Sequence, residues 1–381
     1  MPVPAPTNQQ VELFPTLTLQ HIDAARTSSW HDTFADITFP AQIIDLAELG
    51  EQEEFLRWLE ADSIFYPEGS EGTEETATIS QEPSSRSRSS SNASNSSSSS
   101  IPPVYRLPEL NAAIREAIKS FGGAAFPKLN WTSPKDAAFI LPQASYGPLY
   151  CTTPSDIYLL LKSSDFVTHD IDPITAHSGL DADDPALGIK PKIELVLKKF
   201  ESLNPSREVR AFVRENVLVG VSQRDMNFYD HLQPQEFRDK VVNTVKEFWL
   251  DEIRDNYEGG ANYTIDLYLT PNYEDATIID FQPYRQSTDA LLFTYEELHS
   301  IAQAAISPSS SSSPVSPETT PILPILRIIE SQAHPSVTRN APTYQTSMMP
   351  LEMIELGEGR NMAEFKEAWD EAVRAGMEEE E

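Results

Sequence analysis

The chain has 381 residues, enough for two or three domains of ordinary size. Lysines and arginines total 28 against 59 aspartates and glutamates, so the net charge of −31 excludes nucleic acid or an anionic membrane as the main partner, because both require a basic face. The one cysteine, Cys151, excludes an intramolecular disulfide, and the lack of an 18-residue apolar run or of a secretory-type N-terminus predicts a soluble, cytoplasmic protein.

Two serine-rich stretches interrupt the chain, SSRSRSSSNASNSSSSS at 84–100 and SPSSSSSPVSP at 307–317. Such segments bury too little apolar surface to offset their ordering entropy, so we expect both to be disordered. They divide the chain into an N-terminal part of the fold (1–67), an acidic and serine-rich insert (68–103), a core (104–306), a second insert (307–317) and a C-terminal segment with a helix and an acidic tail (318–381).

The core alternates helical and strand-like patterns. Helices are predicted over 109–121 and 235–254, and short strands rich in β-branched or aromatic residues over 195–200, 209–214, 217–221, 263–269 and 277–281. Glu215–Asn216 suits a two-residue turn between two of these strands. The pattern therefore predicts an α+β fold built from antiparallel hairpins.

Two aspartates occur within the last pair of strands, in YTIDLYL and ATIIDFQP. If Tyr273 is near the centre of the connecting turn, antiparallel pairing places Asp266 opposite Asp280 and Thr264 opposite Gln282. Two facing carboxylates repel unless a cation lies between them, and oxygen ligands of this kind suit Mg²⁺ held jointly with phosphates. The simpler alternative is a pair of exposed strand aspartates.

Basic residues accompany the same strands. They are Lys128 after an apolar run, Lys198 and Lys199 in LVLKKF, Arg210 and Arg214 beside acidic residues in EVRAFVRE, and Arg224 in SQRD. Each alone is explained by a surface charge or a simple ion pair. Together with the carboxylates they predict an ATP–Mg²⁺ site, with lysines on the phosphates and the apolar strand backbone pairing with adenine. The sequence contains neither a Walker A motif, nor a dinucleotide fingerprint, nor a zinc-binding HExxH.

A series of motifs resembles the cell-division-cycle protein 123 family of eukaryotes. In order they are FPKLNWTSPKDAAFI (126–140), LLLKSSDFVTHD (159–170), ELVLKKF (194–200), EVRAFV (208–213), VGVSQRDMNFYDHL (219–232) and IIDFQPYRQSTDALLFTYEEL (278–298). The N-terminal SSWHDTFADITFPAQIIDL and FLRWLEADSIFYP are similar to the opening of that family. The resemblance covers roughly residues 20–66 and 104–300.

This resemblance implies an ATP-grasp-like fold that binds ATP and Mg²⁺. It also implies an assembly factor that binds the γ subunit of eukaryotic translation initiation factor 2, promotes formation of the heterotrimer and supports cell-cycle progression, and that is monomeric by itself. By motif, the nucleotide would be contacted by Lys128, Trp131, Ser133, Lys135, Val196, Leu197, Lys198, Lys199, Glu208, Arg210, Arg224 and Asp266, and the metal by Asp266, Asp280 and Gln282.

One departure from the family pattern concerns the metal. The family motif reads D-F-N-P, whereas this chain has Asp280-Phe281-Gln282-Pro283. Glutamine keeps the amide oxygen but adds a methylene, so Gln282 can still ligate after a small shift. Two other functions remain open: an ATP-grasp ligase that forms an acyl phosphate, for which no acceptor motif is found, and an acidic scaffold with a decayed site.

The C-terminal segment predicts one more helix, over residues 361–377. Asn361 with Glu364 forms a capping-box-like pair, and Phe365 and Trp369 fall on one apolar stripe. This stripe packs either on the protein's own core or, with the region around Trp30, against the γ subunit.

Overall fold

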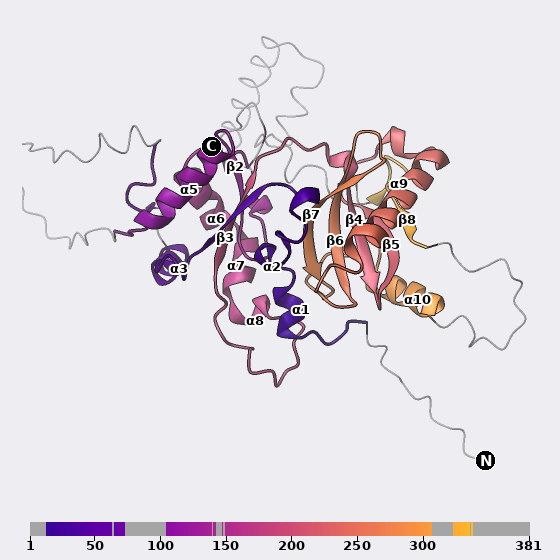
Figure 1. Ribbon diagram of the computed structural model, residues 1–381, viewed down its shortest axis with the longest axis horizontal. Helices are drawn as coiled ribbons and strands as arrows, with labels where there is room; N and C mark the ends of the chain where they lie inside the picture. The colour runs from indigo at the N-terminus through magenta and orange to yellow at the C-terminus, as the bar shows by residue number, and fades with distance from the viewer. Residues whose placement is uncertain are drawn as a thin grey trace, which may run out of the picture. The chain divides into compact units, whose positions relative to one another are not determined.

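Two β-sheets organise the fold, and helices pack on their faces (Figure 1). The computed structural model describes residues 13–62, 65–72, 104–138, 140–141, 147, 149–306, 323–335 and 337. Helices combined with mainly antiparallel strands confirm the predicted α+β class. Both serine-rich stretches and the helix predicted over 361–377 lie outside the described residues. Within the described ranges, every helix is too short or too polar to serve as a membrane span.

The smaller sheet has three antiparallel strands in the order β1-β3-β2. They are β1 (Ala41–Asp45), β2 (Ala125–Lys128) and β3 (Glu194–Lys199). In the central strand β3, Leu195, Val196 and Leu197 are fully buried, as its apolar run predicts. Because side chains alternate along a strand, Leu195 and Leu197 enter one hydrophobic core, while Val196 and Lys198 point to the other face.

Helices cover the face of the smaller sheet that carries Leu195 and Leu197. They are α3 (Gln52–Glu60), α5 (Pro108–Ser120), α6 (Pro154–Ser163) and the short α7 (Asp165–Ile171). The short helix α8 (Pro173–Ala176) follows α7 and places Ala176 in the hydrophobic core of the larger sheet. Helix α5 confirms the prediction over 109–121 and turns an apolar stripe that includes Leu110 and Ile114 into the core. Helix α6 begins at a capping box, in which the Thr153 hydroxyl accepts a hydrogen bond from the Asp156 backbone N–H.

The larger sheet has five strands in the order β7-β6-β4-β5-β8. They are β4 (Glu208–Arg214), β5 (Val217–Gln223), β6 (Tyr263–Leu269), β7 (Ala276–Pro283) and β8 (Ile325–Arg327). The first four confirm the predicted strands to within a few residues. The turn between β4 and β5 is at Glu215 and Asn216, with φ values of 51° and 58°, the left-handed backbone that a type I′ hairpin turn requires. Strand β8 was not predicted, and it pairs parallel to β5.

One helix covers each face of the larger sheet. Helix α9 (Gln235–Phe248) continues into a π-helical turn, Trp249–Ile253, so the single helix predicted over 235–254 has a wider last turn. Helix α10 (Tyr295–Ile306) packs Leu298 on the opposite face, beside Phe212. Gly220 permits this close approach, because a Cβ there would lie 2.9 Å from the Phe293 ring.

The N-terminal segment joins the two sheets before it enters β1. It contains α1 (Leu19–Asp23), α2 (Thr27–Trp30) and a 3₁₀ turn at Ala35–Ile37, and further 3₁₀ turns occur at Lys135–Ala137, Pro205–Arg207 and Asp230–Leu232. The Trp30 ring packs edge-on against Phe281 of β7, with ring centroids 5.2 Å apart. The Thr38 hydroxyl donates to the Ile278 carbonyl at 2.8 Å, so the chain is fixed to β7 directly before it crosses to the smaller sheet.

Candidate nucleotide and metal site

Charged side chains from both sheets gather where the face of β2 and β3 meets β4, β6 and β7. We call this group the cationic cluster. Its basic members are Lys128, Lys135, Lys198, Arg210 and Arg224, and its acidic members are Glu208, Asp266 and Asp280. The basic side chains outnumber the acidic ones, so the cluster has a positive charge within a strongly acidic protein.

The two aspartates lie opposite each other on the hairpin formed by β6 and β7. Asp266 pairs with Asp280 and Thr264 with Gln282, which confirms the register predicted from the sequence. Tyr273 lies in the turn and has a positive φ of 57°. The register shifts by one residue directly after Asp266, a local irregularity that interrupts regular pairing next to the two carboxylates.

Asp266 is the most tightly held acid of the cluster. It is 1% exposed, and Arg210 donates to it from Nε at 2.7 Å and from Nη2 at 2.9 Å. The Nε atom of Arg224 lies 3.1 Å from its Oδ2. Burial alone would raise the pKa of Asp266, but the two guanidinium groups outweigh burial and hold the pKa far below its usual range. Asp266 is therefore ionised at all ordinary pH values.

Asp280 connects the two sheets. Lys128 of β2, itself 1% exposed, donates from Nζ to both carboxylate oxygens of Asp280 at 2.5 Å. From the neighbouring strand β3, the Lys198 ammonium donates to the Ile279 carbonyl and lies 5.3 Å from the centroid of the Trp30 ring. Burial lowers the pKa of Lys198 to about 8, even though Asp280 favours its charged form.

Lys135 is on the solvent side of the cluster. Its side chain is exposed, yet protein groups surround its ammonium closely enough for the loss of hydration, together with the charge of Arg224, to lower the pKa of Lys135 to about 8. Arg224 also pairs with Glu208, so these groups form a continuous chain of charges from Asp266 to solvent.

A divalent metal would fit this site only together with phosphate. No group of three or more histidine, cysteine or acidic side chains is arranged for a metal within the described part of the chain. Mg²⁺ commonly takes one or two carboxylates with phosphate and water oxygens, which Asp266 and Asp280 could supply. Both Asp280 oxygens accept hydrogen bonds from Lys128, so a metal at Asp280 would compete with the Lys128 ammonium for this carboxylate. Gln282 is half-buried on the same strand.

Several predicted nucleotide residues lie outside the cationic cluster. Lys199 points to the opposite face of β3 from Lys198 and pairs with Glu201 at 2.8 Å. Trp131 is 3% exposed, and its indole N–H donates to the Ile22 carbonyl at 2.9 Å. The Arg26 guanidinium covers its ring at 4.6 Å, which leaves no face for a nucleotide base. Ser133 is half-buried two residues before Lys135.

The structure does not favour the expected pairing of adenine with the backbone of Val196 to Lys199. β3 is the central strand, and β1 and β2 occupy its two edges over these residues. The Lys199 backbone N–H also donates to the Pro40 carbonyl at 2.8 Å. No unpaired backbone edge is left for a base, and Leu197 faces the helical core instead.

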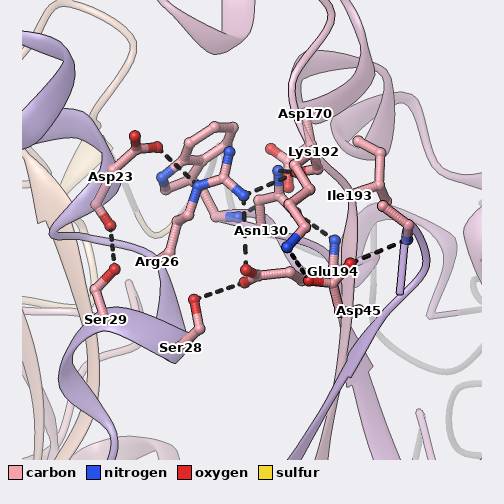
Figure 2. Close-up of polar contacts among 12 residues, drawn as sticks. Asp23, Arg26, Ser28, Ser29, Asp45, Asn130, Asp170, Lys192, Ile193 and Glu194 are labelled. Carbon is pink, nitrogen blue, oxygen red and sulfur yellow. Dashed lines mark hydrogen bonds and ion pairs between the residues drawn. The ribbon is translucent and has the colours of Figure 1, made fainter. Parts of the chain in front are cut away.

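A polar network that the sequence analysis missed holds the loop after Lys128 in place (Figure 2). The Asp170 carboxylate accepts from the backbone N–H groups of Trp131 and Thr132 at 2.9 and 3.0 Å. Asn130 bridges to β3, because its side chain donates to the Lys192 carbonyl and accepts from the Glu194 N–H, each at 2.8 Å. Asn130, Asp170 and Glu194 lie within the motifs quoted above, but nothing in those motifs indicates that they meet, since the partners are distant in sequence. The network fixes the loop that carries Lys128 and Lys135.

Arg26 anchors this network to the N-terminal segment (Figure 2). Its Nη1 donates to the Lys192 carbonyl at 2.8 Å, and its Nε donates to Asp23 at 2.8 Å. Ser28 donates to Glu194 at 2.7 Å from the same segment. Positioning of the cationic cluster therefore depends on α1 and α2 as well as on the strands.

Comparisons with known proteins agree with one another. The D123 family model matches residues 30–357. The "Translation initiation factor eIF2 assembly protein" of Botryotinia fuckeliana is 31% identical over 386 residues, covering 96% of this chain and 90% of the relative. The "Cell division cycle protein 123" of Aspergillus terreus is 34% identical over 293 residues, with coverages of 75% and 64%. The solved structure of C-terminally truncated Cdc123 from Schizosaccharomyces pombe matches with a TM-score of 0.58 and 29% identity, covering 83% of this chain and 99% of that one.

Proposed function

This chain belongs to the D123 family, and from that premise we propose that it binds Mg–ATP at the cationic cluster and assists the assembly of eukaryotic translation initiation factor 2. The finer proposal is that it acts in the cytoplasm as a monomer, binds the γ subunit and promotes formation of the heterotrimer, and so supports cell division. Names of relatives support the assembly role. The ATP role is supported by the geometry of the cluster.

The observation that carries the ATP proposal is the surplus of positive charge in the cationic cluster. Arg210 and Arg224 share Asp266, and Lys128 is neutralised by Asp280. Lys198 and Lys135 have no carboxylate of their own within ion-pair distance among the described residues, and the pKa of each is lowered to about 8. A polyphosphate would supply the missing negative charge and stabilise both ammonium groups.

Each residue of the cluster has a definite role in this proposal. Lys128, Lys135 and Lys198 would contact the phosphates, while Arg210 and Arg224 keep Asp266 ionised and oriented. Asp280, with Gln282 beside it on β7, would hold the metal once Lys128 has moved from its carboxylate. Mg²⁺ would neutralise phosphate charge there. Nothing in this arrangement requires ATP to be cleaved.

Replacing Lys128 with alanine is expected to weaken ATP binding by about tenfold or more and to leave adenosine binding nearly unchanged, because an ammonium on the phosphates cannot help a ligand without them. Calorimetric titration with both ligands measures this difference. Lys199→Ala is the matched control, because Lys199 pairs with Glu201 on the other face of the sheet. An equal loss for both ligands would assign Lys128 a packing role.

ATP affinity should fall as the pH rises from about 7 to about 9. Because the pKa of Lys198 is lowered to about 8, its ammonium is present at neutral pH and lost above that value. Bound phosphate would favour the ammonium, so binding above about pH 8 should take up protons. Calorimetry in buffers of different ionisation enthalpy measures that uptake. Lys198→Met should reduce the uptake and Lys199→Met should not, and an uptake that Lys198→Met leaves unchanged would contradict the assignment.

The assembly role is tested with purified subunits. The chain is mixed with the γ subunit and then with the α subunit of the initiation factor, with and without Mg–ATP, and the joined complex is measured by gel filtration. We expect more complex with the chain and ATP than with either alone. Release of ADP or phosphate in the same reactions separates an ATP-binding assembly factor from an ATP-grasp ligase. Failure to retain γ under any condition would contradict the proposed partner.

A further inference from the structure

A buried arginine without an adequate partner lies at the end of β4, on the same sheet as the cationic cluster. The side chain of Arg214 is 8% exposed, and its Nε and Nη1 atoms are both buried and make no hydrogen bond. The one carboxylate within 4.0 Å of it among the described residues belongs to Glu215, at that limiting distance and 44% exposed. The acidic neighbour that the sequence predicts as a partner, Glu215, therefore makes at most a weak ion pair with Arg214.

A second unpartnered group lies beside this guanidinium. Tyr284, directly after β7, is fully buried, and its hydroxyl also makes no hydrogen bond. The Arg214 guanidinium carbon is 5.3 Å from the centroid of the Tyr284 ring. Phe14 and Tyr295 pack against the same ring, with centroids at 6.4 and 5.1 Å, so the tyrosine cannot easily turn away.

The backbone around Arg214 is rigidly held. The Glu215 N–H donates to the Asn262 side chain, and the Asn216 N–H donates to the Ala261 carbonyl, each at 3.0 Å. These bonds fix the left-handed turn that follows Arg214. A buried cation with unused donors is costly, and a phenol hydroxyl without a partner adds to that cost. Such an arrangement is typical of a site that is completed by a ligand.

We propose that Arg214 and Tyr284 form a receptor for a carboxylate group. The two side chains offer one positive charge and one phenol donor, which match a singly charged carboxylate better than a doubly charged phosphate. A carboxylate would bind Arg214 side-on through Nε, which is buried and makes no hydrogen bond, and the adjacent Nη2. The Tyr284 hydroxyl would donate to the same group. This site is separate from the cationic cluster and does not depend on ATP binding.

The test uses the full chain labelled with ¹⁵N-arginine and the Nε–Hε signals of its arginine side chains. The Arg214 signal is assigned by its loss in Arg214→Lys. Sodium acetate is then titrated at constant ionic strength against sodium chloride. We expect the Arg214 signal to move and saturate, while the signal of Arg254, which pairs with Asp255 on the surface, stays in place. Tyr284→Phe should weaken the acetate response by about threefold or more.

Titrations with other ligands show whether the carboxylate comes from a protein segment or from a small molecule. A short acetylated glutamate peptide that moves the Arg214 signal at lower carboxylate concentration than acetate would identify an acidic protein segment, whereas a response to acetate alone would identify a small carboxylic acid. An Arg214 signal that ignores acetate overturns the proposal, as does one that moves with inorganic phosphate only.

Discussion

Replacing Asp266 with asparagine is expected to lower the free energy of unfolding by about 3–5 kcal/mol. The carboxylate is 1% exposed and accepts from Arg210 through both oxygens, and Arg224 contacts one of them. Loss of its charge leaves two guanidinium groups inside the protein with too little negative charge around them. Urea unfolding measures the change, and Asp239→Asn is the control, because the exposed Asp239 of α9 accepts a hydrogen bond from Gln235 and has no ion pair among the described residues.

The same carboxylate gives the expected pH dependence. Its folded-state pKa is depressed, so its contribution to stability is complete above the unfolded-state pKa of about 4 and is lost as the pH falls toward the lowered value. The wild-type chain should therefore lose more stability than Asp266→Asn between about pH 4 and about pH 2. If the variant unfolds at the same urea concentration as the wild type, the two arginines are neutralised by other groups and the cluster is not held by Asp266.

Local pattern predicted the facing pair of aspartates, because both lie on one hairpin and a turn centred at Tyr273 places Asp266 opposite Asp280. The residues nearest the turn, Leu267 to Leu269, pair one residue out of that register, so the two aspartates face each other only because of the irregularity directly after Asp266, which the sequence did not predict. The turn at Glu215 and Asn216 was also predicted from local pattern, since these two residues, the second an asparagine that tolerates left-handed backbone, separate two β-rich runs.

Contacts between distant segments were not accessible to the same reasoning. Lys128 and Asp280 are 152 positions apart, and nothing local to either residue indicates that they meet. The apolar run of β3 indicates burial, but it cannot show that both edges of the strand are paired, which bears on the expected pairing with adenine. Trp131 was assigned to the nucleotide by motif, whereas its surroundings are set by Arg26 and Ile22, more than 100 residues earlier.

The second large prediction concerns the Lys128–Asp280 pair. Removing the Asp280 charge should affect ATP affinity differently in the presence and in the absence of metal. In Asp280→Asn, binding of Mg–ATP should weaken by about tenfold or more, because one of two carboxylates available to the cation is lost. Binding of ATP in the presence of a chelator should stay the same or become tighter, since Lys128 no longer has a carboxylate to leave. The wild type, by contrast, should bind Mg–ATP more tightly than ATP without metal.

Calorimetric titration of both proteins with ATP, with and without Mg²⁺, measures these four affinities. Glu274→Gln is the matched control, because it removes a carboxylate from the same hairpin, one that pairs with Lys240 on the surface. Thermal unfolding of Asp280→Asn shows whether the buried Lys128 is still accommodated. An equal loss of affinity in both conditions would mean that Asp280 acts by positioning Lys128 and holds no metal. A loss of ATP affinity in the presence of Mg²⁺ but not in its absence would therefore assign the metal to Asp280.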